Sequence, residues 1–385
     1  MMTKVPGLTA TWRKPYTPGT VMFELLVILV LKSGFSMITS FHIKNFRVFK
    51  TLDIQRFGRV NLIVGKNNAG KTCLLEALWL YTGDVAPEIL RSILTQREEF
   101  WQNKNESSDA NHPIYHLFHQ HKDSETIELF DCFLRHLEGV NEYEEECYGY
   151  DLKMNNKFPG KNTFVTEYAG PGGIIRNETL LSELTPYLMS EYRFTGKTHF
   201  LFTTRFVSKQ IEILWDQIVF TAFEDTVIHA LQLIDPEIDR FGLIRNHTKN
   251  EEIEMIPVVF RQGQRVPLRQ LGDGMTHLFH IILALVNAQN GTLLIDEFEN
   301  GLHWRIQPQI WALIFQLAEE LKVQVFATTH SRDCVESFYE AWMLQADESI
   351  GSFLRLNNPP DKTVFVTEYP RKRLGNALTT DVEMR

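Results

Sequence analysis

Apolar and polar residues alternate from about residue 37 to residue 54, which predicts half-buried strands separated by a turn. The apolar positions of this stretch are Ile38, Phe41, Ile43, Phe46, Val48, Leu52 and Ile54. A nearly continuous apolar run at 60–64 then predicts a buried strand. Helical spacing follows at Leu74, Leu75, Ala77 and Leu78. The pattern therefore predicts two strands, a buried strand and a helix, in that order.

The pattern is less regular in the middle of the chain. Residues 81–125 combine helical stretches with a polar gap, QNKNESSDANHP. Strand-like pieces at 163–168 and 199–203 surround an AGPGG turn. Apolar residues recur with a helical period from Ser208 to about Ile234. We therefore expect 81–255 to form an inserted α-rich lobe or arm.

The last third returns to alternating strands and helices. A Gly-Asp-Gly turn at 272–274 runs into an apolar helix, and strands are predicted at 292–295 and over VQVFATTHS. This order predicts an α/β fold with a mixed β-sheet flanked by helices. The expected core consists of 37–80 and 256–345, and 346–385 is expected to be a C-terminal tail.

The turn between the buried strand and the first helix fits the phosphate-binding pattern G-x-x-x-x-G-K-[ST]. Its glycines let backbone N–H groups surround a phosphate, and the helix adds its positive end. Lys71 is expected to reach the β and γ phosphates of a nucleotide, and the Thr72 hydroxyl to ligate Mg²⁺. The predicted loop residues are Gly65, Lys66, Asn67, Asn68, Ala69, Gly70, Lys71 and Thr72.

A second cluster of polar residues lies at two later strand ends. The strand at 292–295 ends in Asp296 and Glu297, and the next strand ends in His330. Beside a phosphate loop, Asp296 would hold Mg²⁺ and Glu297 would orient or deprotonate the attacking water. His330 could sense the γ-phosphate.

Composition limits the classes of protein. The 385 residues are 44% hydrophobic and 23% charged, as in ordinary globular proteins. A net charge of −9 argues against a surface coated for nucleic acid, although it leaves room for a local basic groove. The cysteines are scattered without a C-x-x-C pair, so we expect no disulfide framework and a reducing cytosol. They are Cys73, Cys132, Cys147 and Cys334.

Two segments allow alternative interpretations. Residues 21–31 form an apolar run that resembles a signal-peptide core, but Glu24 interrupts it and it is too short to span a bilayer. We expect 1–36 to be an extension or a mis-assigned start before Met37. A run of histidines, His112, His116, His119 and His121, could in principle bind a metal, but a surface helix with Ile114, Leu117 and Phe118 packed inward is favoured.

Together, the motifs resemble ATP-binding-cassette-type ATPases of the branch that contains RecF, SMC-type proteins and OLD-like ATPases. Gly65–Thr72 matches Walker A, and 293–297 matches Walker B with its catalytic glutamate. Residues 271–274 stand where the family has its signature loop, 299–303 occupy the D-loop, and His330 matches the switch histidine. LLIDEFENGLH and QVFATTHS look most like stand-alone OLD-like AAA-type ATPases.

The resemblance covers roughly 37–345 and implies a P-loop NTPase fold that binds ATP and Mg²⁺. It implies nucleotide contacts from Gly272, Asp273 and Gly274 across a homodimer, although Gly272 replaces the family's serine. It further implies a cytoplasmic ATPase that controls a separate effector protein or DNA, in DNA repair or anti-phage defence, without a membrane partner. Gln210 is a candidate for the family's Q-loop, although its neighbourhood also fits a plain helix.

Three other classes of function remain. One is an OLD-like nuclease acting on DNA, but the 55 residues after His330 (385 − 330) are too few for the family's Toprim domain. Another is a transporter subunit, disfavoured by the 206 residues between loop and signature (271 − 65). The third is an ATP-binding scaffold without turnover, disfavoured because both Asp296 and Glu297 are present.

Overall fold

The computed structural model describes residues 37–99, 113–121, 125–136, 143–155, 163–170, 173–181, 198–202, 208–247, 253–360 and 363–380. The expected extension 1–36 and most of the polar gap lie outside these residues, as does His112.

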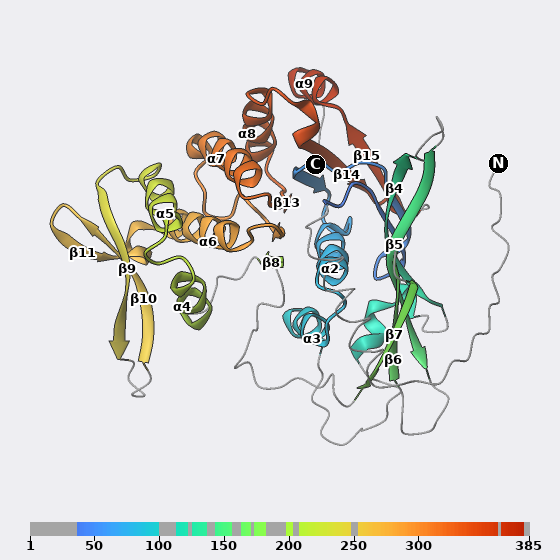
Figure 1. Cartoon of the computed structure of the whole chain (residues 1–385). Coiled ribbons are helices and arrows are strands. Elements are labelled where there is room, and N and C mark those ends of the chain that lie inside the picture. The colour runs from blue at the N-terminus through green and yellow to red at the C-terminus, as the bar shows by residue number, and fades with distance from the viewer. Residues whose placement is uncertain are drawn as a thin grey trace. The chain divides into compact units, whose positions relative to one another are not determined.

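A six-stranded sheet forms the centre of the described chain, in the order β15-β14-β3-β13-β12-β8 (Figure 1). All neighbours are parallel except β14 and β15. The strands are β3 (Val60–Gly65), β8 (Thr198–Leu201), β12 (Thr292–Ile295), β13 (Gln324–Thr328), β14 (Gly351–Asn357) and β15 (Phe365–Tyr369). Since β13 lies between β3 and β12, the ends of all three strands meet at one edge of the sheet.

Alternate residues of the central strands face two separate hydrophobic cores. On β3, Leu62 packs into one core and Ile63 into the other. On β12, Leu293 packs into the same core as Leu62, and Leu294 packs into the same core as Ile63. Because successive side chains of a strand point to opposite faces, the sheet is covered on both sides.

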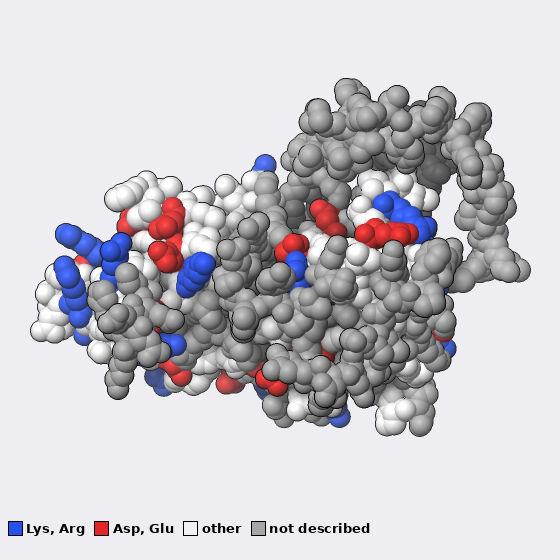
Figure 2. All heavy atoms as spheres, turned by 90° about the horizontal axis from the view of Figure 1, so that it is seen from below, with Lys and Arg blue, Asp and Glu red and all other residues white. Residues whose placement is uncertain are grey.

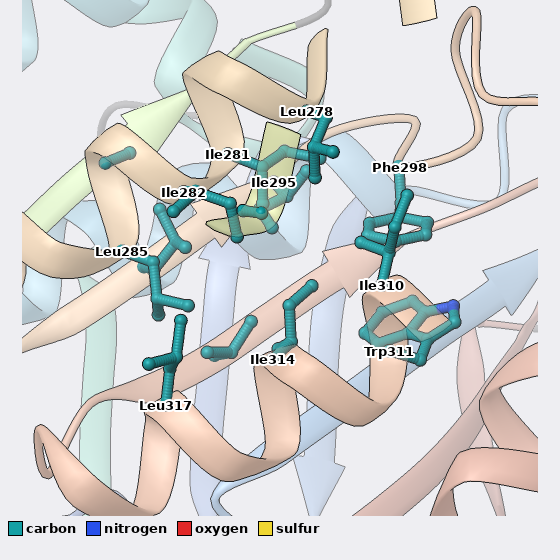
Figure 3. Close-up of a cluster of buried hydrophobic side chains, with 14 of the residues drawn as sticks. Leu278, Ile281, Ile282, Leu285, Ile295, Phe298, Ile310, Trp311, Ile314 and Leu317 are labelled. Carbon is teal, nitrogen blue, oxygen red and sulfur yellow. The ribbon is translucent and has the colours of Figure 1, made fainter. Parts of the chain in front are cut away.

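Helices cover one face of the central sheet. They are α6 (Asp273–Asn287), α7 (Gln307–Glu320), α8 (Arg332–Met343) and α9 (Arg371–Thr379). Figure 3 shows the packing of α6 and α7 against β12, where the rings of Phe298 and Trp311 stack 4.0 Å apart. The labelled core residues are Leu278, Ile281, Ile282, Leu285, Ile295, Phe298, Ile310, Trp311, Ile314 and Leu317. This packing holds β12, and with it the predicted Walker B residues, in a rigid frame.

The other face carries α2 (Lys71–Thr82), α3 (Pro87–Gln96) and an antiparallel sheet in the order β2-β1-β4-β5-β6-β7. Its strands are β1 (Phe41–Phe46), β2 (Phe49–Ile54), β4 (Ile127–His136), β5 (Tyr143–Asn155), β6 (Thr163–Gly170) and β7 (Gly173–Leu180). Short 3₁₀ helices, η2 (Pro113–Leu117) and η3 (His119–His121), lie between α3 and β4. Ile114, Leu117 and Phe118 are buried, as predicted, although the segment is 3₁₀ rather than α-helical.

The remaining elements lie between β8 and α6. They are α4 (Ser208–Asp216), α5 (Ala222–Gln232), β9 (Ile238–His247), β10 (Ile253–Arg261), β11 (Gln264–Pro267) and the 3₁₀ helix η5 (Leu268–Leu271). The 3₁₀ helices η6 (Trp304–Ile306) and η7 (Glu348–Ile350) precede α7 and β14. The predicted helix from 208 to 234 is two helices, because Phe220 has a φ of 61° and Thr221 caps α5 by accepting a hydrogen bond from the Phe223 N–H.

The structure differs from the expected lobe boundaries. The insert 81–255 is not α-rich within its described residues, because β4 to β7 extend the sheet begun by β1 and β2. Its strand β8 pairs with β12, and β14 and β15 of the expected tail complete the central sheet. These strands join their sheets by pairing with residues far apart in the sequence. Local periodicity does not predict such pairing.

The cysteine prediction is corrected by β4 and β5. Cys132 and Cys147 lie directly opposite each other on these strands and are joined by a disulfide, with their Cα atoms 4.0 Å apart. The separation of 15 residues carries no motif; the register of the two strands brings the thiols together. Cys73 and Cys334 are free.

Within the described residues, no helix is both long and apolar enough to cross a membrane.

Candidate functional site

The predicted phosphate loop connects β3 to α2 as the sequence pattern requires. Residues 66–70 form the turn, and α2 begins at Lys71. Gly70 has a φ of 97°, and a Cβ there would lie 2.7 Å from Val48 Cγ1 and 2.8 Å from Phe49 Cζ. The turn between β1 and β2 therefore packs directly on the loop, and only glycine fits at this position.

Lys71 is folded onto the loop that precedes it. Its Nζ donates hydrogen bonds to the carbonyl oxygens of Gly65 (2.8 Å) and Lys66 (3.2 Å), and it lies 3.3 Å from His330 Nδ1. Burial lowers the pKa of the Lys71 ammonium, while the carboxylates of Asp296, Glu299 and Glu297 act in the opposite direction. A nucleotide phosphate at this position would offer the ammonium an anionic partner.

Asp296 is the point where three chain segments meet. Its Oδ2 accepts a hydrogen bond from Thr72 Oγ1 at 2.9 Å, and its Oδ1 accepts one from Thr328 Oγ1 at 2.6 Å. Thr72 and Asp296 are 224 residues apart in sequence. The fold therefore joins the predicted Walker A and Walker B residues directly.

Glu297 follows Asp296 in a constrained backbone conformation, with a φ of 54°. Its N–H donates to Thr328 Oγ1 at 2.9 Å, and Asn300 Nδ2 donates to its carboxylate Oε2 at 2.9 Å. Thr328 and Asn300 thus hold the backbone and the side chain of the predicted general base.

His330 follows the end of β13, opposite the phosphate loop. Its N–H donates to Glu299 Oε1 at 2.8 Å. The second carboxylate oxygen of Glu299 is buried and has no hydrogen-bond partner among the described residues. The charge of this carboxylate raises the pKa of Lys71, against the larger effect of burial. Glu299 therefore links the predicted D-loop to the strand end that carries His330.

The predicted signature residues Gly272, Asp273 and Gly274 lie at the start of α6. Gly272 and Asp273 are exposed. A Cβ on Gly274 would lie 2.4 Å from the carbonyl oxygen of Gly301, so the start of α6 and the D-loop of the same chain are in close contact. The two segments form one continuous surface.

The residues around Asp296 fit a magnesium ion. Mg²⁺ prefers hard oxygen ligands and keeps several waters, and one hydroxyl and one carboxylate already meet here. Thr72 and Asp296 are the side chains that would hold the ion. Bound Mg²⁺ would supply positive charge to the phosphate oxygens.

From the sequence, Glu299 and Asn300 were expected only as part of the D-loop segment, and Thr328 was given no role. Thr328 and Asn300 contact the Walker B residues, and Glu299 contacts His330. Their positions gave a weak indication of a role, because all three are polar and lie within three residues of a predicted site residue.

The predicted histidine run makes a structural contact: His119 Nδ1 lies 2.7 Å from the Arg47 carbonyl oxygen.

Two family models match the chain. Residues 37–170 match a model described as AAA ATPase domain. Residues 193–333 match a model described as AAA domain, putative AbiEii toxin, Type IV TA system. The first match covers the predicted phosphate loop, and the second covers Asp296, Glu297 and His330.

Similar proteins include two curated relatives. The chain is 23% identical over 342 residues to an ATP/GTP phosphatase of Helicobacter pylori, which covers 78% of this chain and 87% of the relative. It is 38% identical over 135 residues to an uncharacterized protein of Methanocaldococcus jannaschii, which covers 34% of this chain and 52% of the relative.

Similar solved structures include two SMC heads. One is an SMC head bound to the C-terminal winged-helix domain of ScpA, with 12% identity, a TM-score of 0.47, and coverage of 87% of this chain and 98% of that chain. The other is the SMC head domain of Thermotoga maritima, with 13% identity, a TM-score of 0.40, and coverage of 87% and 99%.

Proposed function

We propose that this chain is a P-loop ATPase similar to those of the RecF/SMC-like branch, and that it uses ATP-dependent dimerisation to control a partner protein or DNA. Hydrolysis of ATP to ADP and phosphate follows from the AAA-type domains and from the relative that is named for phosphatase activity on ATP and GTP. The role of each site residue and the dimer are our proposals.

Each side chain of the site has a separate role in the proposed reaction. Lys71 and the N–H groups at the start of α2 bind the β and γ phosphates. Thr72 and Asp296 hold Mg²⁺, which neutralises phosphate charge when it is bound. Glu297 takes a proton from the attacking water, and His330, 3.3 Å from Lys71, responds to the γ-phosphate.

One observation carries this proposal. Thr72 and Asp296 are hydrogen-bonded at 2.9 Å, although 224 residues separate them, and Glu297 is the next residue. A glycine-rich turn without a nucleotide role would not require a carboxylate pair from another strand at its helix start. This contact supports our proposal that Asp296 is a metal ligand and Glu297 a base beside the phosphate loop.

The cellular role rests on the resemblance alone. By that resemblance we place the protein in the cytoplasm, in DNA repair or anti-phage defence, beside a separate effector protein. The cysteines do not support this placement, because Cys132 and Cys147 form a disulfide. In such a dimer, Gly272, Asp273 and Gly274 of one chain would complete the phosphate site of the other. The exposure of Gly272 and Asp273 supports this arrangement, because the start of a helix favours an anion.

The test separates binding from chemistry with two variants. Lys71→Ala should abolish tight ATP binding in isothermal titration, because the loop loses its charge on the β and γ phosphates. Lys372→Ala is the matched control, since that lysine is exposed on α9, outside the proposed site. Unchanged affinity in Lys71→Ala would contradict the proposed nucleotide site.

Glu297→Gln keeps the shape of the side chain but removes the base. ATP should still bind, while phosphate release should fall by about 10²–10⁴-fold, the usual contribution of a general base. Turnover equal to that of the unmodified protein would assign the base to another residue.

A further inference from the structure

The sheet β11-β10-β9 has one face packed on the core and one face turned away from it. Phe241 on β9 and Val259 on β10 belong to the core, and the Phe241 ring stacks on Phe279 of α6 at 4.6 Å. Since successive side chains of a strand alternate between faces, Arg240 and Phe260 lie on the opposite face.

Three residues form a row across that outer face. Phe260 lies directly opposite Arg240 of β9 on one side and Arg265 of β11 on the other. Both arginines are exposed and Phe260 is half-buried. Strands are spaced about 4.8 Å apart, so the two arginine backbones lie about 10 Å apart with the aromatic ring between them.

These two arginines carry uncompensated charge. Neither Arg240 nor Arg265 forms an ion pair within the described part of the chain, whereas Arg261 pairs with Asp235 at 2.5 Å and Glu237 at 2.6 Å. Figure 2 shows several Lys and Arg side chains, with Asp and Glu side chains among them, at the end of the molecule formed by this sheet.

No carboxylate in the described part of the chain forms an ion pair with either arginine of the row. Asp239 is exposed next to Arg240, because the register shifts between Phe260 and Arg261 and Ile238 takes the core position. Among the described residues, Asp239 forms no ion pair with either arginine. Glu254 is on the outer face but lies six residues from Phe260 along β10 (260 − 254), and its carboxylate accepts a hydrogen bond from Ser208. The row is therefore a basic and aromatic surface.

We propose that the row Arg240–Phe260–Arg265 binds single-stranded nucleic acid. A base would stack on Phe260, and the two guanidinium groups would contact phosphates on either side. Aromatic stacking combined with arginine contacts to phosphates is the usual way in which proteins hold unpaired strands. A duplex hides the faces of its bases, so this row suits a single strand better.

The strand β11 of this surface is joined along the chain to the residues of the proposed dimer contact. β11 ends at Pro267, η5 spans Leu268–Leu271, and Gly272 follows. A nucleic-acid strand bound on β11 would therefore act on the proposed signature loop through the four residues of η5. This coupling rests on the proposed function, whereas the binding itself does not.

The test measures binding without ATP. Anisotropy of fluorescein-labelled dT₂₀ and rU₂₀ is recorded with the full chain, with Arg240→Ala/Arg265→Ala, and with Lys372→Ala as the control. Lys372 is an exposed cation on α9. The double variant should bind at least tenfold more weakly, and the slope of log K against log salt should fall by about 0.7 for each arginine removed. The control should bind like the unmodified protein.

Phe260→Leu tests the stacking step separately. It keeps an apolar side chain but removes the ring, so we expect about tenfold weaker binding with an unchanged salt slope. Thermal unfolding confirms that each variant is folded. The two oligonucleotides distinguish DNA from RNA.

Two results would overturn the proposal: no binding of either oligonucleotide by the unmodified protein, or equal binding by the double variant. A labelled duplex that binds more tightly than dT₂₀ would also count against a single strand. Loss of phosphate release would contradict the proposed function but not this surface, because the binding assay contains no nucleotide.

Discussion

At the residue scale, Thr328 joins the two residues that the proposed chemistry needs. Its hydroxyl donates to Asp296 Oδ1 at 2.6 Å and accepts from the Glu297 N–H at 2.9 Å. The side chain is fully buried. One hydroxyl therefore fixes the carboxylate of the proposed metal ligand and the backbone of the proposed base. We interpret Thr328 as a positioning residue.

Thr328→Val should lower kcat by about tenfold or more and raise the Mg²⁺ concentration needed for half-maximal turnover. Valine has the same shape but leaves a buried acceptor and a buried donor without partners, at a cost of about 1–3 kcal/mol each. The measurement is phosphate release over a Mg²⁺ titration. Thr328→Ser, which restores the hydroxyl, should recover most of the activity. Equal loss in the serine variant would indicate a packing role instead.

At the element scale, the start of α6 is in close contact with the predicted D-loop of the same chain. Gly274 lies where any Cβ would come within 2.4 Å of the Gly301 carbonyl oxygen. A substitution at Gly274 therefore acts first within its own chain. A side chain introduced there would not report cleanly on a phosphate offered by a second chain.

Gly274→Ala should separate the D-loop from α6. We expect the melting temperature to fall by a few degrees, because overpacking typically costs about 1–3 kcal/mol. Gly242→Ala is the matched control, since a Cβ at Gly242 meets no atom within 4 Å. Differential scanning calorimetry compares the two variants. Equal melting temperatures would show that the contact relaxes without cost.

At the scale of the whole molecule, the proposed dimer predicts that sedimentation depends on nucleotide. Glu297→Gln with ATP should sediment as a dimer, because bound ATP that is not hydrolysed holds both sites closed. Without ATP the same variant should be monomeric, and Lys71→Ala should remain monomeric with ATP. Two-fold symmetry gives two identical sites in such a dimer.

Trp304 provides a variant for the dimer contact itself. Its side chain follows the D-loop and is 54% exposed, with the Arg305 guanidinium 5.2 Å from the ring centre. Exposed tryptophans beside arginines are typical of contact residues. Trp304→Glu in the Glu297→Gln background should bind ATP but sediment as a monomer. A Glu297→Gln protein that stays monomeric with ATP would refute the shared site.

The sequence by itself determined the phosphate loop, its strand and helix, and the strand that ends in Asp296. These features are local, because the loop needs glycine, lysine and threonine at fixed spacing and a buried strand needs a short apolar run. Periodicity likewise predicted that Ile114, Leu117 and Phe118 are buried.

Only the tertiary structure decided which strands belong together. The position of β13 between β3 and β12, the addition of β8 and β14 to the same sheet, and the pairing of Cys132 with Cys147 depend on strand register. Register is set by packing between segments far apart along the chain, so no local window contains it. The same reason explains why the contacts of Thr328 and the row Arg240–Phe260–Arg265 became visible only in the folded chain.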